Sequence, residues 1–182
     1  MTMPTTSKPQ GRLLSYGTLL GAQLYQTFVG GIIAYRTLPR PQFSTLQASM
    51  IPVYFTLQAS LPVVVALTYP GERTFGGRGV SGLSGVLVEG NRTTALYPLL
   101  TMFLAGLTNR LVLGPMTAKV MRQRRHQETI DGKKCYDPAP HSKEMLRLNR
   151  TFAKVHGVCS LVSLLSISSA VYYGVVLANR LE

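Results

Sequence analysis

The sequence predicts an all-α polytopic membrane protein, a bundle of four transmembrane helices with an amphipathic helix before the last span. Three stretches of more than twenty residues, 13–35, 41–71 and 155–179, contain no charged residue. A fourth, 93–109, is also uncharged and continues past Arg110 to residue 118. A hydrocarbon core of roughly 30 Å needs about 20 apolar residues in a helix, so each stretch is long enough to span it.

These stretches fit one membrane domain that covers residues 1–182. We expect the spans at about residues 13–35, 50–68, 94–115 and 157–178, with a glycine-rich loop at 70–92 and a basic polar loop at 119–150.

The charge balance is strongly basic, with nineteen Lys and Arg against seven Asp and Glu and a net charge of +12. In a soluble protein this excess would indicate nucleic acid. Ten of the cations, however, lie between residues 119 and 154, so membrane topology and anionic lipid head groups explain them better. We therefore expect no nucleic-acid partner. Two cysteines without a CxxC pair support neither a zinc site nor a disulfide framework.

Counting cations also predicts the orientation. The first and third connections share one side of the membrane and hold twelve Lys and Arg. The termini and the glycine-rich loop share the other side and hold six. The positive-inside rule then places both termini outside the cytosol or matrix.

Small and amide side chains mark the first span. Gly17 and Gly21 form a GxxxG pair, and small residues one turn apart let helices approach closely in lipid. Gln23 and Gln26 fall on neighbouring positions and should face the bundle. In the last span, Ser166, Ala170 and Gly174 form a second small-residue packing face.

The second span contains an internal repeat of eleven residues, which begins at Pro41 and again at Pro52. Eleven residues are close to three helical turns, so Gln47 and Gln58 should lie on one face. We expect the first repeat unit to lead into the span along the membrane interface, and Pro52 and Pro62 to kink the helix or to start it.

The two loops carry little chemistry. Residues 77–82 of the glycine-rich loop match the pattern GxGxxG, but a dinucleotide site needs a βαβ unit, so we interpret them as a plain loop. In the polar loop, Ser142 can cap a helix whose apolar stripe includes Met145, Leu148 and Phe152. This amphipathic helix should lie near the membrane surface, before the last span or merged with it.

Arg110 is the strongest candidate for a functional group, because a charge inside a membrane is costly and usually lines a cavity or pathway. The alternative is that its guanidinium extends to lipid phosphates. His156 is expected to be an interfacial anchor and not a haem or metal ligand, since the other two histidines lie in the polar loop. The candidates for a ligand site or polar core are Arg110, Asn109, Gln23, Gln26, Gln58 and His156.

No set of nucleophile, base and acid is visible, so we expect no enzymatic activity, no cofactor and no metal. Cations at the membrane surface are expected to contact anionic lipid head groups. These are Arg36, Arg40, Arg122, Arg124 and Arg125.

Several segments, taken in order, resemble the transmembrane protein 205-like family. They are Gly21-Ala-Gln-Leu-Tyr-Gln-Thr-Phe-Val-Gly-Gly, Arg36-Thr-Leu-Pro-Arg40, Phe43 with Pro52-Val-Tyr-Phe55, Asn109-Arg110, Pro115-Met-Thr117, Leu148, Phe152 and His156-Gly-Val-Cys-Ser160. The resemblance covers most of the chain, and residues 124–145 look like the fungal branch. It implies a four-helix membrane protein whose biochemical activity is poorly defined.

Two positions depart from that family's pattern. Arg12 stands where members often carry a histidine, and Ser163 where they often carry an asparagine. If the family had a paired-histidine site, this chain would hold only the His156 half, which counts against a haem or metal role.

We therefore expect a non-enzymatic membrane protein that acts as a subunit, assembly factor or scaffold of a membrane complex. The alternative is a carrier or binder of a small amphipathic or anionic ligand, using Arg110 and the intramembrane glutamines. An uncleaved first span favours the endoplasmic reticulum or another endomembrane. The high charge and the absence of acids before Glu72 favour a mitochondrial membrane instead.

Overall fold

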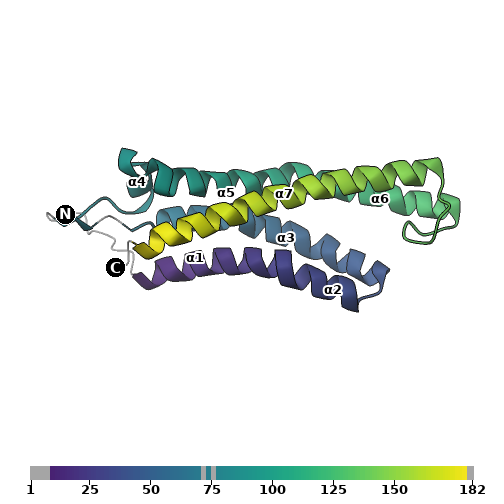
Figure 1. The fold of residues 1–182 in the computed structure, drawn as a ribbon, viewed down its shortest axis with the longest axis horizontal. Coiled ribbons are helices and arrows are strands. Elements are labelled where there is room, and N and C mark those ends of the chain that lie inside the picture. The colour runs from purple at the N-terminus through teal and green to yellow at the C-terminus, as the bar shows by residue number, and fades with distance from the viewer. Residues whose placement is uncertain (1–8, 71–72, 75–76, 180–182) are drawn as a thin grey trace.

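The computed structural model describes residues 9–70, 73–74 and 77–179, and nearly all of them are helical, as predicted. Three helices are long and apolar enough to cross a membrane: Arg40–Leu67, Glu89–Asp131 and Lys143–Asn179. Residues 9–37, which are also helical, are not one of these three candidate spans. The helices form four columns that pack against one another. Figure 1 shows the first helix beginning and the last helix ending at the same end of the bundle.

The first column consists of α1 (Pro9–Leu24), the π-helical turn η1 (Tyr25–Gly30) and α2 (Gly31–Thr37). It packs against α3 and α7. The helix stops at Leu38, whose backbone is extended, and α3 (Arg40–Leu67) begins directly after Pro39. Pro41 occupies the first turn of α3, where a missing N–H costs nothing because no carbonyl would accept it.

The second column is longer than expected. α3 runs through both Pro52 and Pro62 without interruption, so the whole repeat lies in one helix. The first repeat unit is therefore part of the same helix as the second, and not a separate segment that leads into it. Prolines are tolerated inside membrane helices when neighbouring groups satisfy the backbone.

The glycine-rich connection is more ordered than a plain loop. It contains two short antiparallel strands, β1 (Arg73–Thr74) and β2 (Gly77–Arg78), then α4 (Gly82–Leu87) and the 3₁₀ turn η2 (Glu89–Asn91). Gly82 has a φ of +69°, which glycine adopts readily, and its N–H donates to the Tyr69 carbonyl over 2.9 Å. The helix after the GxGxxG match has only six residues and belongs to no βαβ unit.

The third column combines the π-helical turn η3 (Arg92–Leu96), α5 (Tyr97–Thr108), the π-helical turn η4 (Asn109–Leu113) and α6 (Gly114–Asp131). The fourth column is the single helix α7 (Lys143–Asn179). Most of the expected polar loop is therefore helical, and only residues 132–142 connect α6 to α7. The amphipathic helix has merged with the last span. Ser142 caps it as predicted, accepting the Met145 N–H over 3.1 Å.

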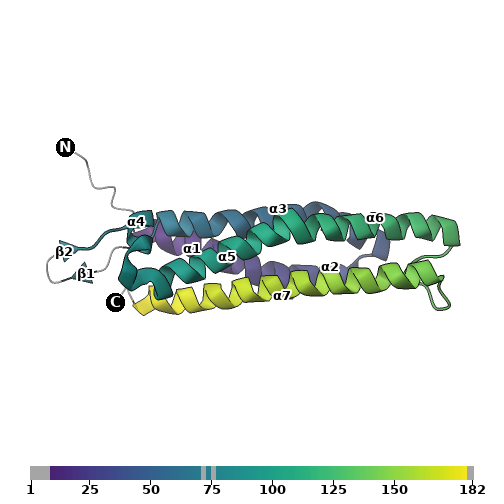
Figure 2. The same ribbon diagram turned by 90° about the horizontal axis from the view of Figure 1, so that it is seen from above.

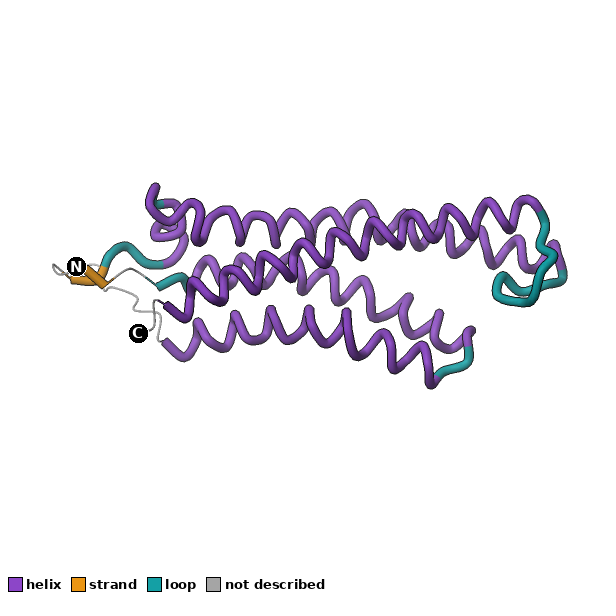
Figure 3. The backbone as a smooth tube through the Cα atoms, viewed as in Figure 1, coloured by secondary structure: helices purple, strands orange, loops and turns teal. Residues whose placement is uncertain are grey.

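Polar residues can be helical here because α6 and α7 pair with each other beyond the rest of the bundle. Figures 2 and 3 show this hairpin reaching farther than the turn between α2 and α3. Val120, Met145 and Leu148 are buried, and the charged residues lie outside them. The burial of these apolar side chains between α6 and α7 therefore explains why the charged segment is helical.

The apolar core has two parts. One cluster lies toward the chain ends and includes Leu19, Leu99, Met102, Ala170 and Tyr173. The other, toward α6, consists of Tyr54, Phe55, Leu113 and Cys159. The outer surface of the four columns is also apolar, with many leucine, valine and isoleucine side chains exposed. Such a surface indicates a membrane protein, because soluble proteins do not expose apolar patches of this extent.

Candidate polar site in the bundle core

A layer of polar side chains lies between the two apolar clusters. Its centre is Asn109, in the first position of η4 and fully buried. The Asn109 amide nitrogen donates to Gln58 Oε1 of α3 over 3.1 Å and to Ser163 Oγ of α7 over 3.0 Å. Three columns are therefore joined through one side chain. Interhelical hydrogen bonds of this kind replace the hydrophobic drive that helices lack in lipid.

Gly106 makes this contact possible. A Cβ at Gly106 would lie 2.5 Å from the Ala59 backbone nitrogen and 2.7 Å from the Gln58 carbonyl carbon. No side chain fits there, so α5 and α3 touch backbone to backbone. One turn later, the short interhelical distance lets the Asn109 and Gln58 amides meet directly.

The first column contributes Gln23, which is 1% exposed. Its height along the bundle axis follows from two contacts that α1 makes with its neighbours. Ser15 Oγ lies 3.1 Å from Thr68 Oγ1, at the end of α3, and the Tyr16 hydroxyl donates to the Ala170 carbonyl of α7 over 3.1 Å. Because α1 runs antiparallel to both α3 and α7, Gln23 lies level with Ser163 and within one turn of Gln58. All four columns thus bring a polar side chain to one level.

Ser166 and the hydroxyl of Tyr54, whose ring belongs to the apolar cluster toward α6, complete the polar layer. We define this layer as Gln23, Tyr54, Gln58, Asn109, Ser163 and Ser166. Tyr54 is 8% exposed and Ser166 is fully buried. Thr27 and Ser163 lie close to the Tyr54 hydroxyl, but neither is placed in full hydrogen-bonding geometry with it. Sequence reasoning assigned Ser166 to helix packing and missed Tyr54 and Ser163, because nothing in a single helix marks which serine or tyrosine faces the amides of another.

Much of the hydrogen-bonding capacity of this layer is unused. Six buried atoms have no partner: Gln23 Oε1, Gln23 Nε2, Gln58 Nε2, Asn109 Oδ1, Tyr54 Oη and Ser166 Oγ. An unsatisfied buried polar group costs about 1–3 kcal/mol, so six of them are a large fraction of the stability of a small domain.

Arg110 does not belong to the polar layer. It is exposed on the outer surface, where its Nε donates to Thr56 Oγ1 over 3.1 Å, and the Thr56 hydroxyl donates in turn to the Pro52 carbonyl. The structure therefore separates the guanidinium from the Gln58 and Gln23 amides. Of the two interpretations of Arg110, this position favours the one in which it extends along the helix surface toward lipid phosphates.

Gln26 and His156 also lie outside the polar layer. Gln26 is half-buried in η1. His156 is exposed, and its ring stacks on Phe152 at 5.5 Å with an interplanar angle of 3°. The guanidinium of Arg124, a residue of α6, lies 4.6 Å from the Phe152 ring of α7. The contact between Arg124 and Phe152 links α6 to α7, and His156 stacks on the same Phe152 ring.

The two predicted packing faces differ. Ser166 and Ala170 are fully buried, and a Cβ at Gly174 would overlap the Tyr16 hydroxyl, so the face on α7 packs within the bundle as expected. Gly17 and Gly21 are exposed, and a Cβ at either would meet nothing within 4 Å. The GxxxG pair thus faces away from the other columns, contrary to its use for packing inside this chain.

The predicted head-group cations lie at one end of the bundle. Arg40 sits 3.6 Å from the Tyr35 ring, and Arg125 donates to Ser44 Oγ over 3.0 Å, which ties α6 to α3. Arg36 and Arg122 are exposed, while Arg124 is half-buried beside Phe152. A surface hollow of about 380 Å³ on the neighbouring part of α7 is lined by Lys143, Leu146, Arg147, Arg150, Thr151 and Lys154.

The described residues contain no group of three His, Cys, Asp or Glu side chains that could hold a metal ion. Cys135, in the connector, is not an activated nucleophile. Burial and the nearby Glu128 carboxylate raise the pKa of this thiol to about 11, so it stays protonated near neutral pH.

Comparison with known proteins gives two matches. Residues 14–126 match the model of a domain of unknown function, DUF4149. The chain is also 27% identical, over 93% of its length and 88% of the relative's, to the xanthocillin biosynthesis cluster protein D of Aspergillus fumigatus. No solved structure matches. Because the family model covers more than half of the chain, this protein belongs to the DUF4149 family.

Proposed function

We propose that this chain is a non-enzymatic, four-span integral membrane protein that acts as a subunit, assembly factor or scaffold of a membrane complex. The observation that carries the proposal is the outward position of Gly17 and Gly21. Both are exposed, and a side chain at either position would be free of contacts inside the chain. A GxxxG pair that none of the described helices of its own chain covers is suited to close packing by a helix of another subunit.

Besides the three long apolar helices, we take the first column, residues 9–37, as a membrane span. These residues run beside α3 and α7, and their outward side chains Leu14, Phe28 and Ile32 are large, apolar and exposed. Such side chains are as well suited to lipid as those of the other three columns. The polar side chain Gln23 is turned inward, so it lowers the hydropathy of the stretch without facing lipid.

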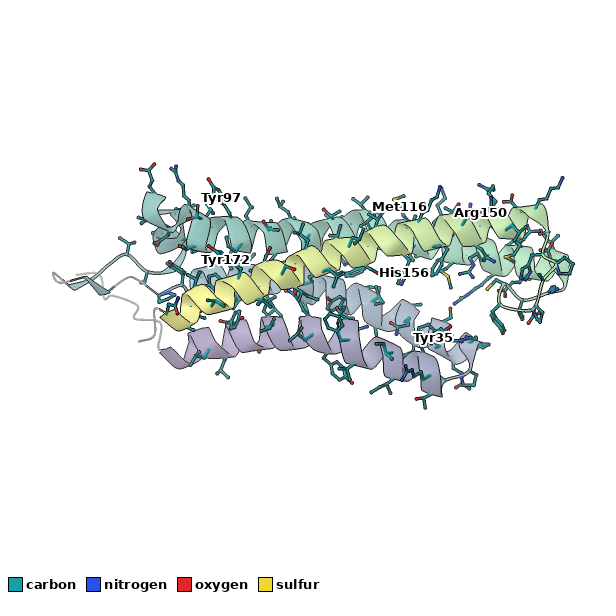
Figure 4. All side chains as sticks on the ribbon, in the orientation of Figure 1. Tyr35, Tyr97, Met116, Arg150, His156 and Tyr172 are labelled. Carbon is teal, nitrogen blue, oxygen red and sulfur yellow. The ribbon has the colours of Figure 1, made fainter. Side chains whose placement is uncertain are left out.

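Exposed aromatic side chains support a membrane position along the bundle. Tyr97 and Tyr172 lie near one end, whereas Tyr35 and His156 lie toward the other (Figure 4). Tyrosines are enriched at both membrane interfaces. About sixteen residues of α7 separate His156 from Tyr172, roughly 24 Å of helix, which is close to the thickness of a hydrocarbon core. Arg150 and the other basic residues of the hairpin then lie beyond the membrane, where anionic head groups can bind them.

We also propose that the chain is a fungal member of the transmembrane protein 205-like family, on the ordered resemblance from residue 21 to residue 160. The name of the Aspergillus fumigatus relative, a biosynthesis cluster protein, supports a role connected with a biosynthetic pathway. Because the first span shows no cleavage pattern, we place the protein in the endoplasmic reticulum or another endomembrane. A mitochondrial membrane is the alternative, and fractionation of cells expressing the full chain separates the two.

The native mass tests the subunit proposal. We expect the wild-type protein in mild detergent to migrate as an assembly larger than one 19.9 kDa chain. The double substitution Gly17→Leu/Gly21→Leu should reduce it to the mass of a monomer, because leucines hold the helices apart. Ser168→Leu is the matched control, since Ser168 is also small and exposed but lies on α7. A monomeric wild type, or a double variant of unchanged mass, would refute the proposal.

A second candidate function is a carrier or binder of a small ligand, and the unpaired amides of the polar layer favour it. The exposed position of Arg110 removes the guanidinium from such a site. The Arg110→Ala variant should therefore leave ligand binding in the polar layer unchanged.

A further inference from the structure

The polar layer is closed at both ends by apolar side chains. Leu19, Met102 and Ala170 lie toward the chain ends, and Leu113 and Cys159 lie toward α6. Five of its members are less than 8% exposed, and Tyr54 is 8% exposed. Solvent that merely covers the surface therefore cannot supply hydrogen bonds to its atoms.

Six polar atoms in this enclosure lack a partner within the protein. Both polar atoms of Gln23 are among them, together with Gln58 Nε2 and Asn109 Oδ1. Buried polar groups in native proteins are almost always satisfied by protein, ordered water or ligand, and the need is greater inside a membrane. Such a concentration of unpaired groups indicates that something else completes their hydrogen bonds.

The backbone is modified at the same level. Two columns turn from α-helix to π-helix here: η1 follows Gln23 by two residues, and η4 begins at Asn109 itself. π-helical turns inside α-helices occur frequently at functional sites. This observation does not depend on the unpaired side chains, and it marks the same place.

The chemistry of the unpaired atoms limits what can occupy the layer. The amide nitrogens of Gln23 and Gln58 donate, the amide oxygens of Gln23 and Asn109 accept, and the hydroxyls of Tyr54 and Ser166 can do either. No Asp, Glu, Lys, Arg or His among the described residues is buried, so no charge is available to compensate an ion. Burying an unpaired ion is prohibitively costly, and the occupant must be uncharged.

We propose that the polar layer binds a small uncharged guest that both donates and accepts hydrogen bonds. Two sources provide this chemistry: ordered water molecules, and a hydroxyl- or amide-bearing small molecule. This proposal deepens the second candidate function given above. It does not depend on the subunit function, because the layer lies inside the bundle and the Gly17/Gly21 face lies outside it.

Thermal unfolding of the full-length protein in detergent decides whether a guest is present. Gln23→Met keeps the length of the side chain and removes both unpaired atoms. With a guest, the substitution removes its hydrogen bonds, and we expect Tm to fall by about 2–4 °C or more. Without a guest, it removes an unsatisfied buried amide, and Tm should rise. Gln26→Met is the matched control, three residues later and only half-buried, and should leave Tm unchanged.

A second pair of measurements identifies the source. Hydroxyl radicals generated in ¹⁸O-labelled water should label the buried Tyr54 if water occupies the layer. Denaturing extraction followed by mass spectrometry should release an equimolar compound if a small molecule does, and the amount should fall in the Gln23→Met variant. A rise in Tm for that variant would overturn the proposal. A fall in Tm with neither a Tyr54 label nor a released compound would also overturn it, because protein groups would then satisfy the amide.

Discussion

Gly106→Ala is expected to destabilise the bundle by about 1–3 kcal/mol or more, which is the cost of overpacking a close contact. The added methyl group would lie 2.5 Å from the Ala59 nitrogen and 2.6 Å from the Ala59 Cα. These are backbone atoms of α3, so they can move only if the two helices separate. The gain of up to about 1 kcal/mol from the better helix propensity of alanine does not offset this cost. The midpoint of thermal unfolding in detergent, followed by circular dichroism, measures the effect.

Gly157→Ala is the matched control for this prediction. Gly157 also lies within a long helix, but a Cβ there would meet nothing within 4 Å. Its replacement should be neutral or stabilising by up to about 1 kcal/mol. If both variants unfolded at the same temperature as the wild type, α3 and α5 would not approach as closely as described.

Asn109→Leu is expected to cost on the order of 2 kcal/mol or more. The substitution removes the donor that serves both Gln58 Oε1 and Ser163 Oγ, which leaves two buried acceptors without it. A second substitution, Gln58→Leu, should restore part of the lost stability, because it removes one of the two buried acceptors that lack a donor. The coupling energy of the double-mutant cycle should be near the 0.6–1.7 kcal/mol found for hydrogen bonds between membrane helices.

Thr108→Val provides the control, since Thr108 precedes Asn109 on the same helix but is exposed. It should change the free energy of unfolding by less than about 0.5 kcal/mol. A destabilisation of Asn109→Leu equal to that of Thr108→Val would mean that the polar layer contributes nothing to the bundle.

The helical class of this chain and most of its elements could be predicted from sequence, because uncharged runs longer than twenty residues leave few alternatives. The ends of the helices could not. Charged residues 119–131 look like a loop, yet they form the second half of a long helix that pairs with α7. The apolar stripe through Met145 and Leu148 predicts the helix that contains it, but it does not predict the helix over residues 119–131 that packs against it.

The polar layer was predictable in part. Gln23, Gln58 and Asn109 stand out as amides in apolar runs, and the structure buries all three. Their common level depends on the register between antiparallel helices, which no single segment contains. Ser163 and Tyr54 belong to the layer through that register alone.

The most recognisable glycine motif in the sequence is not the one that packs helices of this chain together. The GxxxG pair at Gly17 and Gly21 faces outward, whereas the isolated Gly106 lies against backbone atoms of α3. An isolated glycine has no pattern from which its contact can be recognised. The difference follows from geometry: Gly106 lies where α3 and α5 cross, and Gly17 lies on the side of α1 that no other column covers.

Whether residues 9–37 cross the membrane decides between four spans and three. The most direct measurement is protease protection in sealed vesicles, with tags at the N-terminus, at the C-terminus and in the connector after Pro138. Four spans predict that both terminal tags are on the same side of the membrane and that the connector tag is on the opposite side. Terminal tags on opposite sides would mean that only the three helices beginning at residues 40, 89 and 143 cross the membrane, and would contradict the four-span bundle.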